Sequence, residues 1–177
     1  MSKQLRAGEK FPSLDAKSIH GRPVTVPDGR WTHLQFRRFA GCPICNLHLQ
    51  NFVTRYPEIA AARINEVVVF HSPDEELLPY QGRFPFDVIG DPKKSLYRRY
   101  GVETSLRAVL DPHAWPASVK GNLQKDKPAL GGIPQGGILG LPADFLIAPD
   151  GTISAVHYGK HADDQWSVDD MLALPTQ

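Results

Sequence analysis

The only two cysteines of the chain, Cys42 and Cys45, lie three residues apart, directly after a strand-like run over 31–39. Pro43 follows the first of them, and proline is favoured at the first position of a helix. The pattern therefore predicts a strand that leads into a helix with both thiols at its start. A thiol pair at this spacing can alternate between dithiol and disulfide without large backbone motion. We expect a thiol-based redox protein.

The position of Cys42 at the helix N-cap predicts which thiol reacts first. An N-cap side chain accepts hydrogen bonds from free backbone N–H groups of the first turn, and the helix dipole adds partial positive charge. Both effects favour a thiolate with a lowered pKa, so we assign Cys42 as the nucleophile. Arg37 and Arg38 lie just upstream, and either could add positive potential. Cys45, expected to be less exposed, would resolve a mixed disulfide or sulfenic acid on Cys42.

Two weaker explanations of the cysteine pair stay open. The cysteines could be small buried apolar residues, although chance rarely places the only two at this spacing before a proline. His48 lies one further turn along the expected helix, so Cys42, Cys45 and His48 could hold structural zinc, without an obvious fourth ligand. Covalent haem attachment is excluded, because Asn46 stands where a histidine is required. We expect neither a metal nor a cofactor.

Length and charge restrict the domain number and the partners. A chain of 177 residues is most simply one domain over 1–177. A formal net charge of +1 argues against nucleic-acid or membrane-surface partners, which require a concentrated basic face. The apolar runs fall well short of the ~20 residues of a membrane span, and the polar N-terminus shows no signal peptide. A cytoplasmic location is expected, where such a pair rests mostly reduced.

The rest of the sequence alternates strand-like and helix-like segments. We expect a hairpin within 5–30, a strand over 31–39, a helix from Pro43 that restarts near Pro57, a strand over 66–70, a helix over 73–80, a strand over 86–89, a helix from its N-cap Asp91 to about Gly101, strands over 144–148 and 152–157, and a helix over 167–174 capped by Ser167. This alternation predicts an α/β sandwich with a central sheet. Residues 110–141, rich in glycine and proline, are predicted to be a loop-rich insertion covering part of the active face.

Several short motifs resemble the peroxiredoxin-like proteins of the AhpC/TSA family, within the thioredoxin-fold superfamily. They are residues 8–12 (GEKFP) with 21–24 (GRPV), residues 34–38 (LQFRR) followed by the Cys-Pro-Ile-Cys motif, Asp91 with 100–102 (YGV), and residues 141–147 (LPADFLI) with 149–151 (PDG). The resemblance covers most of the chain. It implies a thioredoxin-like sandwich with a central mixed β-sheet flanked by helices and preceded by an N-terminal hairpin.

The sequence also departs from the peroxiredoxin pattern at three positions. Peroxiredoxins use Pro-x-x-x-Thr/Ser-x-x-Cys, and alignment on Cys45 places Cys42 at the Thr position and Arg38 at the Pro position. The arginine that peroxiredoxins carry before the late strand is replaced by Pro142. Pro142 instead resembles the cis-proline that thioredoxins place beside their CxxC motif, so a cis peptide bond is expected there. These departures favour dithiol–disulfide exchange over efficient peroxide reduction.

Together these expectations describe an antioxidant oxidoreductase that cycles a Cys42–Cys45 disulfide. The substrate would be a peroxide or a protein disulfide, and a thioredoxin- or glutathione-type thiol would restore the dithiol. Pro142, Arg37 and Arg38 are expected at the substrate-binding site. The alternative is a redox-sensing or protein-binding module with slow or no turnover. A homodimer is compatible with the sequence.

Overall fold

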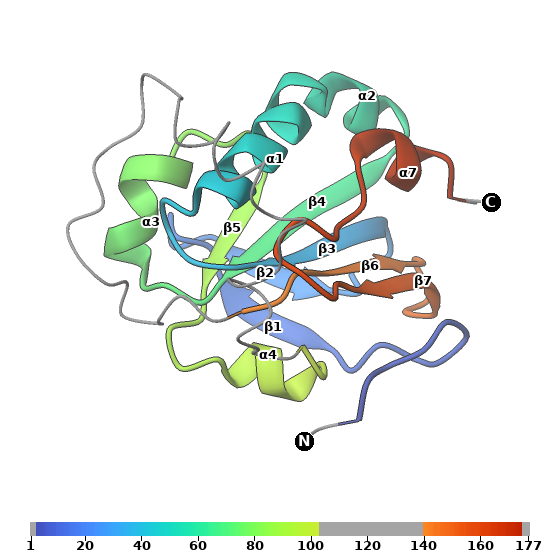
Figure 1. The fold of residues 1–177 in the computed structure, drawn as a ribbon. Coiled ribbons are helices and arrows are strands. Elements are labelled where there is room, and N and C mark those ends of the chain that lie inside the picture. Colours follow the sequence, from blue (N-terminus) through green and yellow to red (C-terminus); the bar gives the residue numbers. More distant parts are fainter. Residues whose placement is uncertain (1–2, 103–139, 175–177) are drawn as a thin grey trace.

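The centre of the molecule is a five-stranded mixed β-sheet (Figure 1). The computed structural model describes residues 3–102 and 140–174, so the predicted insertion lies almost wholly outside the described residues. The strands are β3 (Trp31–Arg37), β4 (Ile64–Phe70), β5 (Asp87–Gly90), β6 (Ala143–Ile147) and β7 (Ile153–Tyr158), in the spatial order β5-β4-β3-β6-β7. The first three pair in parallel, whereas β6 is antiparallel to β3 and to β7.

Helices and a hairpin cover the two faces of this sheet (Figure 1). One face carries α1 (Pro43–Thr54), α2 (Tyr56–Ala61) and α7 (Val168–Leu172), with α3 (Asp74–Gln81) beside α1; the other carries α4 (Ser95–Arg99) and the antiparallel hairpin of β1 (Leu14–Lys17) and β2 (Pro23–Val26). Strand β4 contributes side chains to the hydrophobic cores on both faces of the sheet, because successive side chains of a strand point to opposite faces. Val68 and Phe70 pack beneath α1, and Val67 and Val69 pack toward the hairpin. The predicted α/β sandwich with an N-terminal hairpin is confirmed.

Helix α4 begins later than the sequence predicts. Asp91 was expected at the N-cap, but Lys94 occupies that position in a left-handed conformation and the helix starts at Ser95. The buried carboxylate of Asp91 nevertheless accepts hydrogen bonds from the N–H groups of Ser95 and Leu96, at 2.9 and 2.7 Å. A carboxylate that reaches across an intervening turn can satisfy the first free N–H groups of a helix as an N-cap does.

The peptide bond before Pro142 is trans, so the expected cis bond is wrong. Across residues 3–102 and 140–174, the only cis peptide joins Val26 to Pro27. The carbonyl of Pro142 accepts the Gly159 N–H at 2.9 Å, and a Cβ on Gly159 would lie 2.7 Å from Pro142 Cγ. The hydrogen bonding between β6 and β7 thus continues at Pro142, one residue before the start of β6. No described helix is long and apolar enough to cross a bilayer.

Candidate active site

Cys42 occupies the N-cap of α1, as the sequence predicts. Its Sγ accepts the backbone N–H of Cys45 at 3.5 Å, one of the donors that a helix start leaves unsatisfied. The chain reaches this position through a tight turn, in which the Cys42 N–H donates to the Phe39 carbonyl at 3.1 Å. Gly41 lies within the turn at a φ of 69°, a conformation that glycine adopts without a steric penalty.

The loop between β3 and α1 is fastened to the segment that follows β4. Ala40 donates its N–H to the Ser72 hydroxyl at 3.0 Å, and His71 donates its N–H to the Arg38 carbonyl at the same distance. From this loop the Arg38 side chain turns back, so that its Nη1 lies 3.6 Å from Cys42 Sγ. Its guanidinium also lies 5.2 Å above the centre of the Phe39 ring. Of the two candidate arginines, Arg38 is therefore the one that contacts the thiol.

The surroundings of the two thiols drive their pKa values apart. Burial raises the pKa of Cys42, but the Cys45 thiol, the Arg38 charge and two backbone N–H groups outweigh it and lower that pKa to about 6. Burial raises the pKa of Cys45 well above its ordinary value, and the neighbouring Cys42 sulfur adds to the effect. Near neutral pH the pair is thus a thiolate at Cys42 beside a thiol at Cys45. This is the arrangement of a nucleophile with a resolving thiol.

Both thiols are free and both are buried, which corrects one expectation. Cys42 has 0% and Cys45 1% of its surface exposed, so the first cysteine is not the more accessible one. The reason is that the loop before α1 folds inward, and Phe39, Ala40 and Ile44 join the thiols in the core beneath α1. A substrate therefore has to displace neighbouring side chains before it reaches Cys42.

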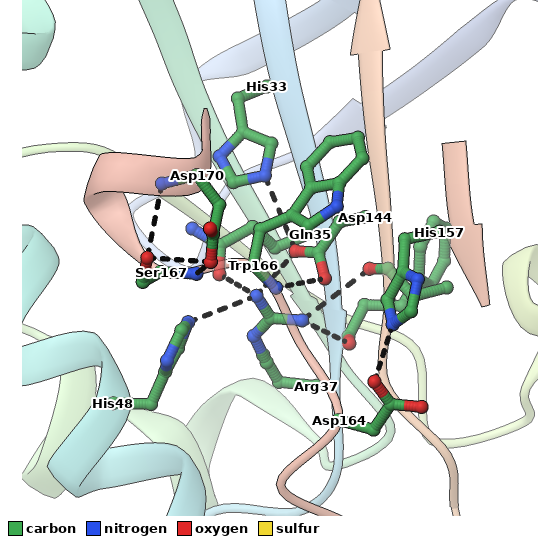
Figure 2. A network of polar contacts seen from close by, with 12 residues as sticks. His33, Gln35, Arg37, His48, Asp144, His157, Asp164, Trp166, Ser167 and Asp170 are labelled. Carbon is green, nitrogen blue, oxygen red and sulfur yellow. Dashed lines mark hydrogen bonds and ion pairs between the residues drawn. The ribbon is translucent and has the colours of Figure 1, made fainter. Parts of the chain in front are cut away.

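A second group of polar side chains is buried between the sheet and α1 (Figure 2). We call it the buried ionic cluster; it comprises His33, Gln35 and Arg37 of β3, Glu66 of β4 and Asp144 of β6. Arg37 donates to the Asp144 carboxylate at 2.6 Å and to the side-chain amide oxygen of Gln35. His33 lies between two carboxylates, 3.0 Å from Glu66 and 3.3 Å from Asp144. Arg37, predicted at the substrate site, thus points into this cluster.

Charges within the cluster fix the protonation of its members. Burial opposes a charged His33, but Glu66 and Asp144 outweigh it and raise the pKa of His33 to about 9. Burial opposes ionisation of Asp144 as well, yet Arg37 and His33 hold its pKa well below the usual value. The cluster therefore balances two cationic side chains against two carboxylates, the condition under which buried charges are tolerated.

His48 faces this cluster. Its Nε2 lies 3.3 Å from Arg37 Nη2, so the imidazole accepts a hydrogen bond from the guanidinium (Figure 2). Burial and the Arg37 charge lower the pKa of His48 well below its ordinary value, which keeps the ring neutral. Within the described part of the chain, no three His, Cys, Asp or Glu side chains are grouped to hold a metal ion.

Two more residues border the site. Tyr97 was not identified from the sequence, whereas His71, directly after the strand over 66–70, was considered as a proton acceptor or as a loop histidine without function. The buried Tyr97 hydroxyl donates to the carbonyls of Arg37 and Val69, which ties α4 to the end of β3. The ring of His71, also buried, packs against those of Phe39 and Tyr97. The buried ionic cluster had one sequence signal. Polar residues alternate along the central strand at His33, Gln35 and Arg37, which indicates that polar side chains line one face of that strand.

The raised pKa of His33 predicts a loss of stability at alkaline pH. Between about 6.5 and 9 the folded protein holds a proton that the unfolded chain releases. The contribution of His33 is therefore complete below pH 6.5 and is lost as the pH rises through 9, an effect of up to about 3 kcal/mol. The measurement is urea unfolding from pH 6 to 9.5.

Cys42 acts in the opposite direction, because its lowered pKa makes the folded protein release a proton first. The urea series should therefore be run on a double variant, Cys42→Ser with Cys45→Ser. His33→Gln in that background should flatten the curve, and an NMR titration of the His33 ring gives its pKa directly. A pKa near 6.5, or equal slopes with and without His33, would contradict the assignment.

Comparison with known proteins agrees with this geometry. The model of the family described as AhpC/TSA antioxidant enzyme matches residues 51–161, more than half of the chain, and the match begins after Cys45. No curated protein sequence matches the chain. Three examples of similar solved structures, all at low identity, establish the fold alone. They are peroxidoxin BcpB from Mycobacterium tuberculosis (16% identity, TM-score 0.66, 91% of this chain and 90% of that one), a putative thiol:disulfide interchange protein DsbE from Chlorobium tepidum (19%, 0.59, 88% and 87%) and a reduced 2-Cys peroxiredoxin from Plasmodium vivax (13%, 0.67, 95% and 79%).

The strand order, the N-terminal hairpin and the helix that begins at the cysteine pair are therefore those of a thioredoxin-like sandwich, as the sequence predicts. The sequence resemblance and the family model lead to the same conclusion: this chain belongs to the AhpC/TSA antioxidant enzyme family.

Proposed function

We propose that the protein is a thiol oxidoreductase that cycles a disulfide between Cys42 and Cys45. The observation that carries the proposal is the setting of Cys42, whose Sγ lies 3.5 Å from the Cys45 N–H nitrogen and 3.6 Å from Arg38 Nη1. Donors at these positions favour the thiolate, which is the nucleophilic form of cysteine. Membership of an antioxidant enzyme family supports an oxidoreductase.

With a hydroperoxide the proposed cycle balances in two steps. The Cys42 thiolate attacks the distal peroxide oxygen, the O–O bond breaks, and the alkoxide or hydroxide leaves with a proton as an alcohol or water. The Cys45 sulfur then attacks the sulfenic acid on Cys42, an S–S bond forms, and water leaves. With a disulfide substrate, Cys42 forms a mixed disulfide and Cys45 displaces the second substrate thiol.

An external thiol of the thioredoxin or glutathione type then returns two electrons to the pair. We place this cycle in the cytoplasm, where thiol systems of this kind keep cysteine pairs reduced. Arg38 stabilises the Cys42 thiolate, and Pro142 is proposed to border the substrate although its peptide bond is trans. Arg37 has no direct part, because its buried guanidinium bonds Asp144 and Gln35.

Oxidation of the reduced protein by hydrogen peroxide tests the peroxide reaction. We expect a second-order rate well above that of a free thiol at the same pH, and an intact mass lower by two hydrogens. Cys45→Ser is the matched control: it should react at a similar rate and gain one oxygen, because the resolving thiol is missing. A rate equal to that of a free thiol would exclude peroxides as substrates and leave disulfides as the substrate class.

Burial of both thiols supports a second candidate, a redox-sensing or protein-binding module with slow turnover. Cys42 is 0% exposed, so access of a substrate is the slow step if the surrounding side chains rarely move. The two candidates differ under excess peroxide and thiol reductant. A module stops after one oxidation per chain, whereas an enzyme continues to consume peroxide. The rate of Cys42 alkylation measures the access itself.

A further inference from the structure

The reduced and oxidised forms of the cysteine pair differ in charge at Cys42. In the reduced form the thiolate accepts the Cys45 N–H and faces the Arg38 guanidinium, at 3.5 and 3.6 Å. In the disulfide the same sulfur is neutral and a weak acceptor. The hydrogen bonds from the Cys45 N–H and from Arg38 are therefore weaker in the disulfide than in the thiolate. Both contacts therefore stabilise the dithiol relative to the disulfide.

Resting on the thiol–disulfide cycle proposed above, we propose that Arg38 raises the reduction potential of the Cys42–Cys45 pair by an amount that grows with pH. The pair's equilibrium with monothiols of the glutathione class is thereby shifted toward the reduced protein. Stabilising a reduced form makes its disulfide more oxidising. Arg38 thus determines which thiols are strong enough reductants to complete the cycle.

The equilibrium concerned has a defined balance. One Cys42–Cys45 disulfide and two glutathione thiols give the reduced protein and one glutathione disulfide. Two electrons pass from glutathione to the protein. The S–S bond of the protein breaks, and an S–S bond forms between the two glutathione molecules. Of the two protons that glutathione releases, one binds Cys45, and the other binds Cys42 at low pH or enters the solvent once Cys42 ionises.

The position of Arg38 makes its charge effective. The side chain is only 6% exposed, and it lies over the Phe39 ring rather than in water. A charge acts more strongly across such a poorly solvated contact than on an open surface. Hydrogen bonds from Ala40 to Ser72 and from His71 to the Arg38 carbonyl fix the loop that carries the guanidinium.

Other titratable groups near the pair come from three elements. Helix α1 contributes Cys45, and α4 contributes Tyr97, whose pKa is raised well above its ordinary value by burial, by Asp91 and by Cys45, so that it stays neutral. The segment after β4 contributes His71, which packs on the rings of Phe39 and Tyr97. Histidine commonly ionises near neutral pH, so the test has to separate its effect from that of Arg38.

The expected pH dependence follows from ionisation of Cys42 in the reduced form alone. With the pKa of Cys42 at about 6, the equilibrium constant for reduction by glutathione is flat below pH 6 and rises tenfold per pH unit above it. Between pH 5 and 8 the rise is about 100-fold, equivalent to about 60 mV. Without the Arg38 charge the rise begins at higher pH and is smaller over this range.

The experiment equilibrates the protein with glutathione buffers from pH 5 to 8, quenches in acid and measures the disulfide fraction by intact mass. Arg38→Met removes the charge, Arg38→Lys retains one, and Arg83→Met removes an exposed arginine as the matched control. We expect a delayed rise only in Arg38→Met, partial or full retention in Arg38→Lys and the wild-type curve in Arg83→Met. Circular dichroism confirms that each variant is folded.

Several outcomes would overturn the inference. If the equilibrium constant for wild type and for Arg38→Met starts to rise at the same pH, Arg38 does not control the potential. The ionisation then belongs to another group such as His71. A wild-type constant that is flat from pH 5 to 8 rejects the inference without any variant. If diamide produces no Cys42–Cys45 disulfide at all, the proposed function fails as well, whereas the other outcomes leave it standing.

Discussion

Cys42→Ser is expected to reduce turnover with either substrate class by at least about a thousandfold, because a serine hydroxyl does not ionise near neutral pH and cannot replace the thiolate. The fold should be retained, since serine is itself a favoured N-cap residue and its oxygen can accept the Cys45 N–H. The measurement is steady-state consumption of peroxide or of a disulfide substrate with excess thiol reductant, together with urea unfolding.

Cys45→Ser separates the two cysteines. This variant should still react once with substrate and then stop as a sulfenic acid or a mixed disulfide, because the resolving thiol is missing. Substantial turnover by Cys42→Ser would refute Cys42 as the nucleophile. If Cys45→Ser is the variant that no longer reacts at all, the two roles are exchanged.

Asp144→Ala is expected to destabilise the protein by about 3–5 kcal/mol, the usual effect of removing one partner from a buried ion pair. The carboxylate of Asp144 contacts both Arg37 and His33, so its loss leaves two buried cations with one carboxylate fewer. Urea unfolding at pH 7 measures the loss. Asp169→Asn is the matched control, because its ion pair with Arg55 is exposed and should contribute little.

A paired replacement tests the reason for that loss. Arg37→Met combined with Asp144→Leu removes both charges of the ion pair and leaves His33 with Glu66. Replacing a buried ion pair by apolar residues is often close to neutral, so this variant should be more stable than Asp144→Ala. A loss below about 1 kcal/mol for Asp144→Ala would mean that water compensates the charges and that the cluster is less dry than its burial indicates.

Elements specified by local chemistry were predictable from the sequence. Pro43 after Cys42 indicated a helix start, and the structure has both the N-cap and its hydrogen bond. Ser167 was likewise expected to cap the last helix, and it forms a capping box with Asp170. In both cases the residues that determine the conformation lie within four positions of one another, so no knowledge of the tertiary structure was required.

Features that depend on distant contacts were not predictable. Which of Arg37 and Arg38 reaches the thiol depends on how the chain leaves β3, and that is set by hydrogen bonds to residues after β4. The buried ionic cluster requires the strand register, which pairs His33 with Glu66 and Gln35 with Asp144. The resemblance that suggested a cis bond before Pro142 concerned sequence alone, and the isomer of that bond is not specified by the neighbouring residues; in the structure it is trans.

The buried ionic cluster also limits how this sequence can vary during evolution. Arg37 and Asp144 lie on neighbouring strands but 107 positions apart in the chain, and each satisfies the charge of the other. A substitution at either position leaves the partner as an unpaired buried charge, which destabilises the protein. The singly changed sequence is therefore less fit than both its ancestor and its doubly changed descendant. Lineages that share this fold should therefore carry the pair intact or lose both members together. The two positions, on the paired strands β3 and β6, should covary.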